Sequence, residues 1–335
     1  MRIVVTNQIF PETQKLLMAS AEIICNPTPE PWPAEVVLSH CRDADAVLAF
    51  MPDKIDARFI AACPKLKVIG AALKGYDNID VSAAERAGVW VTIVPDLLTI
   101  PTAELAIGLM LGLSRHILAG DRRIRAEGFH GWRPKLYGKG LQGARVGIVG
   151  FGLVGQAIAE RLLGFRCRLT AYDTRSNCIP AHLVHAVDAA PLEELLAQSD
   201  YVVLALPLTA ETHRIIGAGA LGRMKRGALL VNPARGSLVD ESAVADALEA
   251  GHLAGYAADV FECEDWARTD RPSVIDARLT APGAPTVLTP HIGSAVVDVR
   301  RQIEVSAAHS IVDVLEGRAP ACAVNKPDRP RACST

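Results

Sequence analysis

The chain has 335 residues, half of them apolar, and a formal net charge of −2 at pH 7. This length suits two domains, and the composition is typical of a globular protein. The small net charge gives no electrostatic support for nucleic-acid binding. The eight cysteines form no metal-type spacing, so free thiols in the cytoplasm and no metal are expected. The most apolar stretch, residues 105–113, is too short to span a bilayer, so no membrane contact is expected.

Residues 1–96 alternate short apolar, β-rich runs with helical patterns. Strands are expected at residues 3–6, 22–25, 46–50, 68–71 and 89–94. Helices are expected around residues 12–18, 34–41, 57–63 and 81–87. Alternation at this spacing predicts a parallel sheet that is covered by helices on both faces.

A long apolar segment follows the first half. Pro101 near its start favours a helix there, and the apolar pattern predicts that the helix continues to about Arg125. An aromatic and basic arm comes next, at residues 129–137. Neither segment carries a motif of its own, so its role depends on the rest of the chain.

A glycine-rich turn organises the second half. An apolar run at 146–149 leads into Gly150, Gly152 and Gly155, and a helical pattern follows. The first glycine permits a tight turn, the second lets a pyrophosphate approach the backbone, and the third allows close helix packing. Asp173 ends the next predicted strand, where an adenine ribose needs a hydroxyl acceptor. The pattern predicts dinucleotide binding, and a flavodoxin-like turn without a ligand is the alternative.

Later strands of the second half are expected at residues 168–172, 201–206, 228–231, 255–260 and 287–288. Three of them end in polar clusters that contain Arg235, Glu264 and His291. In a doubly wound sheet such strand ends form the ligand crevice. Singly, the three could be a surface cation, a solvated loop acid and a turn histidine. Together they suggest an anion clamp and a histidine that is oriented by a carboxylate.

These motifs resemble the D-isomer-specific 2-hydroxyacid dehydrogenase family over nearly the whole chain. The matching stretches, besides the glycine turn, are residues 205–209, 232–236, 259–264 and 289–293. The fold class implied is α/β, with two doubly wound parallel-sheet lobes. One would be a Rossmann NAD-binding domain and the other a flavodoxin-like substrate domain, with the active site in the cleft between them.

The expected domain boundaries follow from this reading. Residues 1–96 and 292–325 would form a discontinuous substrate domain, since a closing helix at about 296–315 packs best on the first lobe. Residues 97–291 would form the dinucleotide-binding domain. The resemblance implies that its segment at about 101–140 builds a homodimer. Residues 326–335 are expected to be a flexible tail, because they are rich in proline and charge.

The resemblance also implies individual roles. Arg235 would anchor the substrate, His291 would act as acid or base, and Glu264 would be its partner. NAD is the implied cofactor, with weaker use of NADP because Arg175 offsets the charge of Asp173. The implied cofactor-binding residues are Lys74, Thr102, Gly150, Gly152, Leu153, Val154, Gly155, Asp173, Leu206, Pro207, Thr212, Pro233, Ala234, Arg235, Asp259, His291 and Gly293.

The substrate lobe departs from the general family pattern. Lys74 stands where a small or apolar residue is commoner, and Asp265-Trp266 replaces the usual proline. These details resemble the family branch that oxidises phosphite to phosphate. Trp132, Tyr137 and Arg300 are further contributors, and a dimer contact is the alternative for the two aromatic residues. The implied substrate-binding residues are Met51, Lys74, Gly75, Leu98, Arg235, His291 and Ser294.

Three functions therefore remain open. The first is NAD-dependent oxidation of phosphite, a small anion, by hydride transfer with a water that His291 activates. The second is a D-2-hydroxyacid dehydrogenase of the glyoxylate or hydroxypyruvate reductase kind. The third, a corepressor-like protein that senses NAD, is the most remote, because the catalytic trio is intact. A solvated loop lysine is the alternative for Lys74, and core packing is the alternative for Met51.

Overall fold

The computed structural model describes residues 1–175, 178–265 and 268–331 and divides into two compact units. The first unit holds Met1–Leu98 and the chain from Ser294 onward, together with residues 268–269. The second holds Thr99–Asp265 and Asp270–Gly293. Each unit is built on one parallel sheet, so the expected α/β class with two parallel-sheet domains is confirmed.

The first unit has a five-stranded sheet in the order β2-β1-β3-β4-β5, and every pairing is parallel. This order is that of flavodoxin-like sheets. Its elements are β1 Arg2–Val5, α1 Pro11–Met18, β2 Glu22–Cys25, α2 Ala34–Cys41, β3 Ala46–Ala49, α3 Ala57–Ala62, β4 Val68–Ala71, α4 Val81–Arg86, β5 Trp90–Thr92 and α12 Val297–Leu315.

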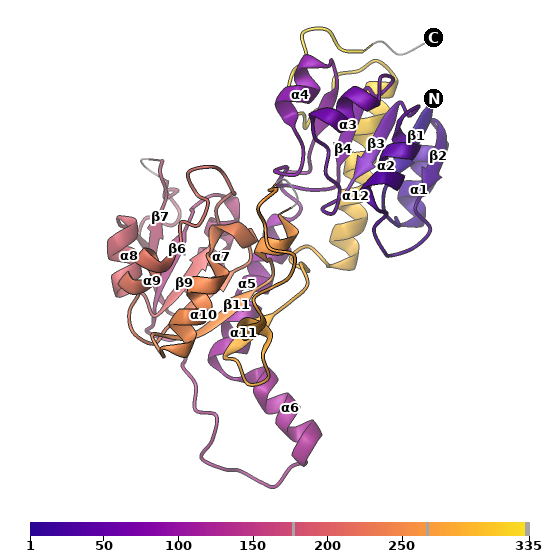
Figure 1. The fold of residues 1–335 in the computed structure, drawn as a ribbon. Helices are drawn as coiled ribbons and strands as arrows, with labels where there is room; N and C mark the ends of the chain where they lie inside the picture. The colour runs from indigo at the N-terminus through magenta and orange to yellow at the C-terminus, as the bar shows by residue number, and fades with distance from the viewer. Residues whose placement is uncertain (176–177, 266–267, 332–335) are drawn as a thin grey trace. The chain divides into compact units, whose positions relative to one another are not determined.

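The sheet of the first unit is covered on both faces. One core lies between the sheet and α2, α3 and α4, and another lies between the sheet, α1 and α12. All four residues of β3 and all four of β4 are buried, which explains their continuous apolar sequence. Figure 1 shows α12, in yellow, running along this sheet. Helix α12 therefore belongs to the first unit, although most of the second unit lies between residues 1–98 and α12 in the sequence.

The second unit has a seven-stranded sheet in the order β12-β11-β10-β9-β6-β7-β8, and every pairing is parallel. Its elements are α5 Thr99–Ser114, α6 Ile117–Glu127, β6 Arg145–Val149, α7 Leu153–Leu163, β7 Arg168–Tyr172, β8 Val187–Ala189, α8 Leu192–Gln198, β9 Tyr201–Leu204, α9 Ala218–Arg223, β10 Ala228–Asn232, the 3₁₀ turn Gly236–Leu238, α10 Glu241–Glu249, β11 Leu253–Ala258, the 3₁₀ turn Glu262–Glu264, α11 Ala277–Thr280 and β12 Thr286–Leu288.

The strand order of the second unit determines where its polar residues meet. The order reverses between β6 and β9, and ligands of open α/β sheets bind at such a switch point. The ends of β10, β11 and β12 follow at one side of that point. Since all the strands are parallel, the glycine turn after β6 and the clusters with Arg235, Glu264 and His291 lie along one edge of the sheet.

Two expectations are corrected by the structure. The long helix predicted from Pro101 to about Arg125 is two helices, α5 and α6, because His116 between them has a left-handed φ of 53°. The C-terminal tail is packed as far as Arg331. The Arg331 guanidinium donates to the carbonyls of Ala87, Cys63 and Leu66 at 2.8 Å each, contacts that proline and charge content alone do not indicate.

In the described part of the chain, no single helix is long and apolar enough to cross a membrane, although the bent pair α5 and α6 passes on length and composition. Burial explains why α5 is so apolar, since ten of its 16 residues are buried in the second unit. The same part of the chain contains no group of three or more His, Cys, Asp or Glu side chains that could hold a metal ion.

Candidate active site

The glycine turn between β6 and α7 has the shape that a dinucleotide needs. A Cβ at Gly150 would lie 2.6 Å from the Ala205 carbonyl oxygen, and one at Gly155 would lie 2.3 Å from the Gly150 oxygen. A Cβ at Gly152 would meet nothing within 4 Å. The first and third glycines are therefore required by packing, while the open side of Gly152, at the start of α7, leaves room for a pyrophosphate. This turn fits NAD.

Asp173 stands just beyond β7 and faces the same turn. Its Oδ2 accepts a hydrogen bond from the Phe151 N–H at 2.8 Å. Arg175 donates to both carboxylate oxygens at 2.9 Å, and this contact, more than any other, holds the pKa of Asp173 well below its usual range. Asp173 is therefore ionised, and Arg175 engages both of its oxygens in this structure.

Other predicted cofactor residues lie along the same edge. Leu206 follows β9, and its Cβ would be 2.7 Å from a Cβ at Gly150. The Thr212 hydroxyl donates to the Pro207 carbonyl at 2.7 Å and so shapes the loop after β9. A Cβ at Gly293 would lie 3.4 Å from the Thr102 hydroxyl, which brings the start of α5 beside the turn after β12.

Asp259 organises the turn that carries His291. It lies just after β11 and is buried, and burial raises the pKa of its carboxyl. Its oxygens accept hydrogen bonds from the Thr289 hydroxyl at 2.6 Å and from the N–H groups of Ile292 and Gly293 at 2.8 Å. His291 has a left-handed φ of 54°, which a non-glycine residue rarely adopts. The Asp259 contacts hold this strained residue in place.

Glu264 and His291, which the sequence predicted to be partners, are in direct contact. Glu264 Oε2 lies 2.9 Å from His291 Nδ1, and its Oε1 accepts the Phe261 N–H at 2.9 Å. An ionised carboxylate only accepts, so Nδ1 carries the proton and Nε2 is left to exchange a proton with a bound molecule. Both side chains are about a quarter exposed, so solvent or substrate can reach them.

Arg235 follows β10 in a turn that its neighbours stabilise. The Asn232 side-chain amide donates through Nδ2 to the Arg235 carbonyl at 2.8 Å and accepts the Ala234 N–H through Oδ1 at 3.1 Å. Pro233 lies between them in this turn. The Arg235 guanidinium also donates to the Ala234 carbonyl at 2.8 Å and is half-buried. A guanidinium held at this edge suits the bidentate binding of a carboxylate or oxyanion.

The first unit contains the remaining predicted substrate residues. Met51 follows β3 and packs partly on the core, and Lys74 follows β4. Lys74 is half-buried, and burial lowers its pKa, against the opposing charge of Asp96. Arg300, on α12, lies at the same edge, where it donates to the Ala72 carbonyl at 3.4 Å and sits 5.8 Å from the Phe50 ring centroid. Gly75, Leu98 and Ser294 belong to this unit as well.

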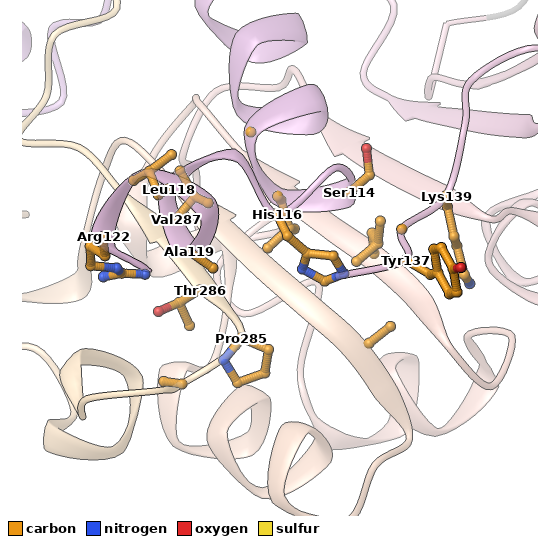
Figure 2. A pocket seen from close by; sticks show the side chains of 16 residues that line it. Ser114, His116, Leu118, Ala119, Arg122, Tyr137, Lys139, Pro285, Thr286 and Val287 are labelled. Carbon is orange, nitrogen blue, oxygen red and sulfur yellow. The ribbon is translucent and has the colours of Figure 1, made fainter. Parts of the chain in front are cut away.

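The aromatic residues of the arm lie elsewhere in the second unit. Trp132 and Tyr137 are each about three-quarters exposed. Tyr137 lines a cavity of about 230 Å³ with Ser114, His116 and Lys139, as Figure 2 shows. Residues of α5 and α6 line part of this cavity, and neither Glu264 nor His291 lines it. Trp266 lies outside the described residues.

Two features of the site were not expected from the sequence. The family resemblance implied that Asp259 binds the cofactor, and the structure shows its carboxylate holding the His291 turn. The second feature is a set of buried carboxylates, Glu241, Glu262 and Asp265, behind the turns of Arg235 and Glu264. Acids close to Asp259 and Glu264 in the sequence were the available signal, but burial could not be read from them.

The fold and this site define a nicotinamide-dependent oxidoreductase: a Rossmann sheet with a dinucleotide turn, beside an arginine and a carboxylate-oriented histidine. Residues 107–293 match the family described as D-isomer specific 2-hydroxyacid dehydrogenase, NAD binding domain. The chain belongs to the D-isomer specific 2-hydroxyacid dehydrogenase family. NAD as cofactor and an enzymatic role are thereby confirmed.

Relatives and solved structures cover nearly the whole chain. A glyoxylate reductase of Pyrococcus furiosus is 39% identical over 299 residues, which are 88% of this chain and 86% of that protein. A glyoxylate reductase of Thermococcus litoralis is 35% identical over 97% of both chains. A solved structure of a Thermus thermophilus protein has a TM-score of 0.86 at 34% identity, covering 97% of this chain and 100% of that one.

Proposed function

We propose that the chain moves a hydride between NAD and a small anionic substrate, with His291 as the acid–base residue. The observation that carries this is the pair of Glu264 Oε2 and His291 Nδ1 at 2.9 Å, on the sheet edge that also bears the dinucleotide turn. Arg235 on the neighbouring strand end supplies the cation for the anion.

The chain's own groups divide the remaining work. When bound, the nicotinamide accepts or supplies the hydride. In the direction of reduction, His291 Nε2 gives a proton to the substrate carbonyl oxygen and the product is a 2-hydroxy acid. Glu264 stabilises the protonated imidazole before the transfer and keeps the ring oriented. Arg235 binds the carboxylate, so that the carbonyl carbon stands at a fixed distance from Nε2.

The relatives favour glyoxylate or a similar 2-oxo acid as the substrate. Curated proteins at 35–39% identity are named glyoxylate reductases, and they match most of this chain. A carboxylate beside the reacting carbonyl needs one cation, which Arg235 supplies. We therefore place a D-2-hydroxyacid dehydrogenase of this kind first. These relatives are named as enzymes and give no support to the corepressor-like alternative.

Phosphite oxidation is a second candidate, and Lys74 is the observation that favours it. Phosphite has up to two charges and no carbon chain, so its binding depends on cations and donors that offset desolvation. Lys74 is half-buried on the strand edge of the first unit, where Arg300 adds a further cation. In this reaction His291 would take a proton from water as the water oxygen bonds to phosphorus. The P–H hydrogen would leave as hydride, giving phosphate and a reduced nicotinamide.

One assay tests both candidates. Purified protein is supplied with NADH and glyoxylate, or with NAD and phosphite, and nicotinamide absorbance is followed. Consumption of NADH with glyoxylate supports the first candidate, and formation of NADH and phosphate supports the second. If D-lactate, D-glycerate, glyoxylate and phosphite are all inert while NAD binds, the enzymatic assignment of this site is wrong.

Self-association through α6 and the arm is also a proposal. Every residue of α6 is at least partly exposed, including Ile117 and Ile124. Phe129, Trp132 and Tyr137 on the arm are each about three-quarters exposed, and Figure 1 shows this segment projecting from the second unit. Apolar surface of this extent marks an interaction site. Sedimentation of the wild type against Trp132→Ser tests whether the arm joins two copies.

The cytoplasmic location stays a prediction.

A further inference from the structure

Behind the catalytic edge, two chain segments of the second unit are joined through buried carboxylates. The first segment starts at Arg235 and runs into α10, and the second runs from Phe261 to Asp265. Gly236 packs directly on the second segment, since a Cβ there would lie 1.8 Å from the Phe261 carbonyl carbon. The turn that carries Arg235 thus touches the turn that carries Glu264.

Two hydrogen bonds between Glu241 and Glu262 cross-link the segments. Glu241 Oε1 accepts the Glu262 N–H at 2.8 Å, and Glu262 Oε2 accepts the Glu241 N–H at 3.3 Å. A third contact lies nearby, where Asp265 Oδ2 accepts the Ser237 N–H at 2.7 Å. All three carboxylates are at most 4% exposed. Loss of one of these hydrogen bonds would therefore leave a buried polar group that water does not reach, which is unfavourable.

Two features of this cluster limit the electrostatic repulsion between its buried carboxylates. Arg214 donates to Glu262 Oε1 at 3.0 and 3.1 Å, which compensates that carboxylate. Burial raises the pKa of Glu241 to about 7, and the nearby charge of Glu262 adds to the effect. Near pH 7 a substantial share of Glu241 is therefore neutral, which lessens repulsion with Glu262, and Oε1 accepts the Glu262 N–H in either form. The contact therefore depends on an oxygen at that distance and not on a second charge.

We propose that Glu241 is a positioning residue for the reaction: through the Glu262 backbone it holds the Arg235 turn at a fixed spacing from the Glu264 turn. The anion clamp and the acid–base pair then keep their relative placement from one turnover to the next. Glu241 touches neither substrate nor NAD in this arrangement. The inference rests on the proposed function, because it assumes that Arg235 and His291 act on one substrate.

Two variants of Glu241 test the proposal by opposite expectations. Glu241→Gln keeps the side-chain length and the Oε1 acceptor, so kcat and KM should stay within about twofold of wild type. Glu241→Asp keeps the acid but shortens its reach by about 1.5 Å, one carbon–carbon bond. It should lower kcat/KM for the anion on the order of tenfold to a hundredfold, the scale of a 1 Å misplacement. The Kd for NADH should change less than kcat/KM, since the glycine turn, which carries several of the predicted cofactor contacts, is a separate segment.

The control is Glu249→Gln, an exposed acid on the same helix, which should behave as wild type. Equal activity of the Asp variant and wild type, with both folded, would overturn the proposal. Loss of activity in the Gln variant to the same degree would also overturn it, because the acceptor would then not be what matters.

A second measurement separates this proposal from the function itself. The titration of the His291 imidazole is followed by NMR, with its resonance assigned from His291→Ala. Glu241→Asp should shift that titration, since a loosened Glu264 turn alters the contact with Nδ1, and Glu241→Gln should not. This readout needs no substrate, so it decides the role of Glu241 even if neither glyoxylate nor phosphite is turned over. An unshifted titration in the Asp variant would refute the positioning role.

Discussion

Both units present the carboxyl ends of a parallel sheet, but the polar side chains at the two edges are held differently. In the second unit, Glu264 and Asn232 are tied to backbone groups of their own turns, and Asp259 is tied to backbone groups of the neighbouring turn that carries His291. In the first unit, the edge carries two cations, Lys74 and Arg300. The candidate residues of one edge are fixed by hydrogen bonds to the backbone, and those of the other edge include two cations.

From this difference we expect the second unit to govern the chemical steps and the first unit to govern the choice of substrate. The fixed turns of the second unit suit any member of a family that uses the same hydride and proton steps. The cations at the edge of the first unit can add binding energy for an anion with more than one charge. We therefore expect substitutions at His291 and Glu264 to act mainly on kcat, and substitutions of the first-unit cations to act mainly on KM.

The largest effect should come from His291→Ala, which removes the proton carrier of the second unit. We expect kcat to fall on the order of a hundredfold or more, the usual scale for a positioned acid or base. Steady-state nicotinamide absorbance measures it. His309→Ala, on α12, is the matched control. Near-normal turnover by the His291 variant would exclude it from the mechanism.

Lys74→Ala tests the first unit. If two cations bind the substrate, KM for phosphite should rise on the order of tenfold to a hundredfold, the range for a charge-assisted hydrogen bond. KM for glyoxylate should change less, because a single carboxylate is already met by Arg235. Lys54→Ala, an exposed lysine of the same unit, should leave both values unchanged. An equal rise in KM for both anions would contradict a phosphite-specific role.

Asp173→Ala should change the cofactor preference. The ionised carboxylate favours ribose hydroxyls and repels a 2′-phosphate, so its removal should shift the NAD/NADP ratio of kcat/KM toward NADP on the order of tenfold. Arg175→Ala should shift the ratio toward NAD. The variant removes a positive charge 2.9 Å from the Asp173 carboxylate, which offsets the repulsion of a 2′-phosphate. Unchanged ratios in both variants would show that the ribose is bound elsewhere.

A last effect, on stability and not on activity, concerns the first unit. Burial raises the pKa of Asp53 to about 6, while its carboxyl accepts the Phe50 N–H at 2.7 Å. A carboxyl with a raised folded-state pKa binds more protons when folded, so the free energy of unfolding should fall as pH rises from about 4 to 6. Asp53→Asn should reduce this loss in the free energy of unfolding between pH 4 and pH 7 by about 1 to 3 kcal/mol. Denaturant unfolding at pH 4 and pH 7 measures it, and identical pH slopes would contradict the assignment.

Much of the fold was predictable because buried parallel strands leave continuous apolar runs. The strand expected at residues 228–231 is β10, Ala228–Asn232, and the glycine turn lies where the pattern placed it. The short strand β8 was missed because only one of its three residues is buried, so no apolar run marks it. The break at His116 was missed because a left-handed residue in an apolar stretch has no compositional signal.

The candidate site was predictable to a similar degree, and for a related reason. Arg235, Glu264 and His291 follow apolar strands, and parallel strand ends meet at one edge, so their neighbourhood could be inferred. The contact between Glu264 and His291 is observed at 2.9 Å. The sequence did not show that Glu241 and Glu262 exchange hydrogen bonds, because that depends on how α10 packs against the turn after β11.

The central claim is direct hydride transfer between a small anion and NAD. The most direct measurement follows a deuterium label by mass spectrometry, in NADH that carries deuterium at both C4 positions with glyoxylate and in P–D phosphite with NAD. The account predicts that the label passes undiluted to C2 of glycolate in the first case, or to the nicotinamide in the second. Product that forms without the label, or label that appears in neither product, would contradict it.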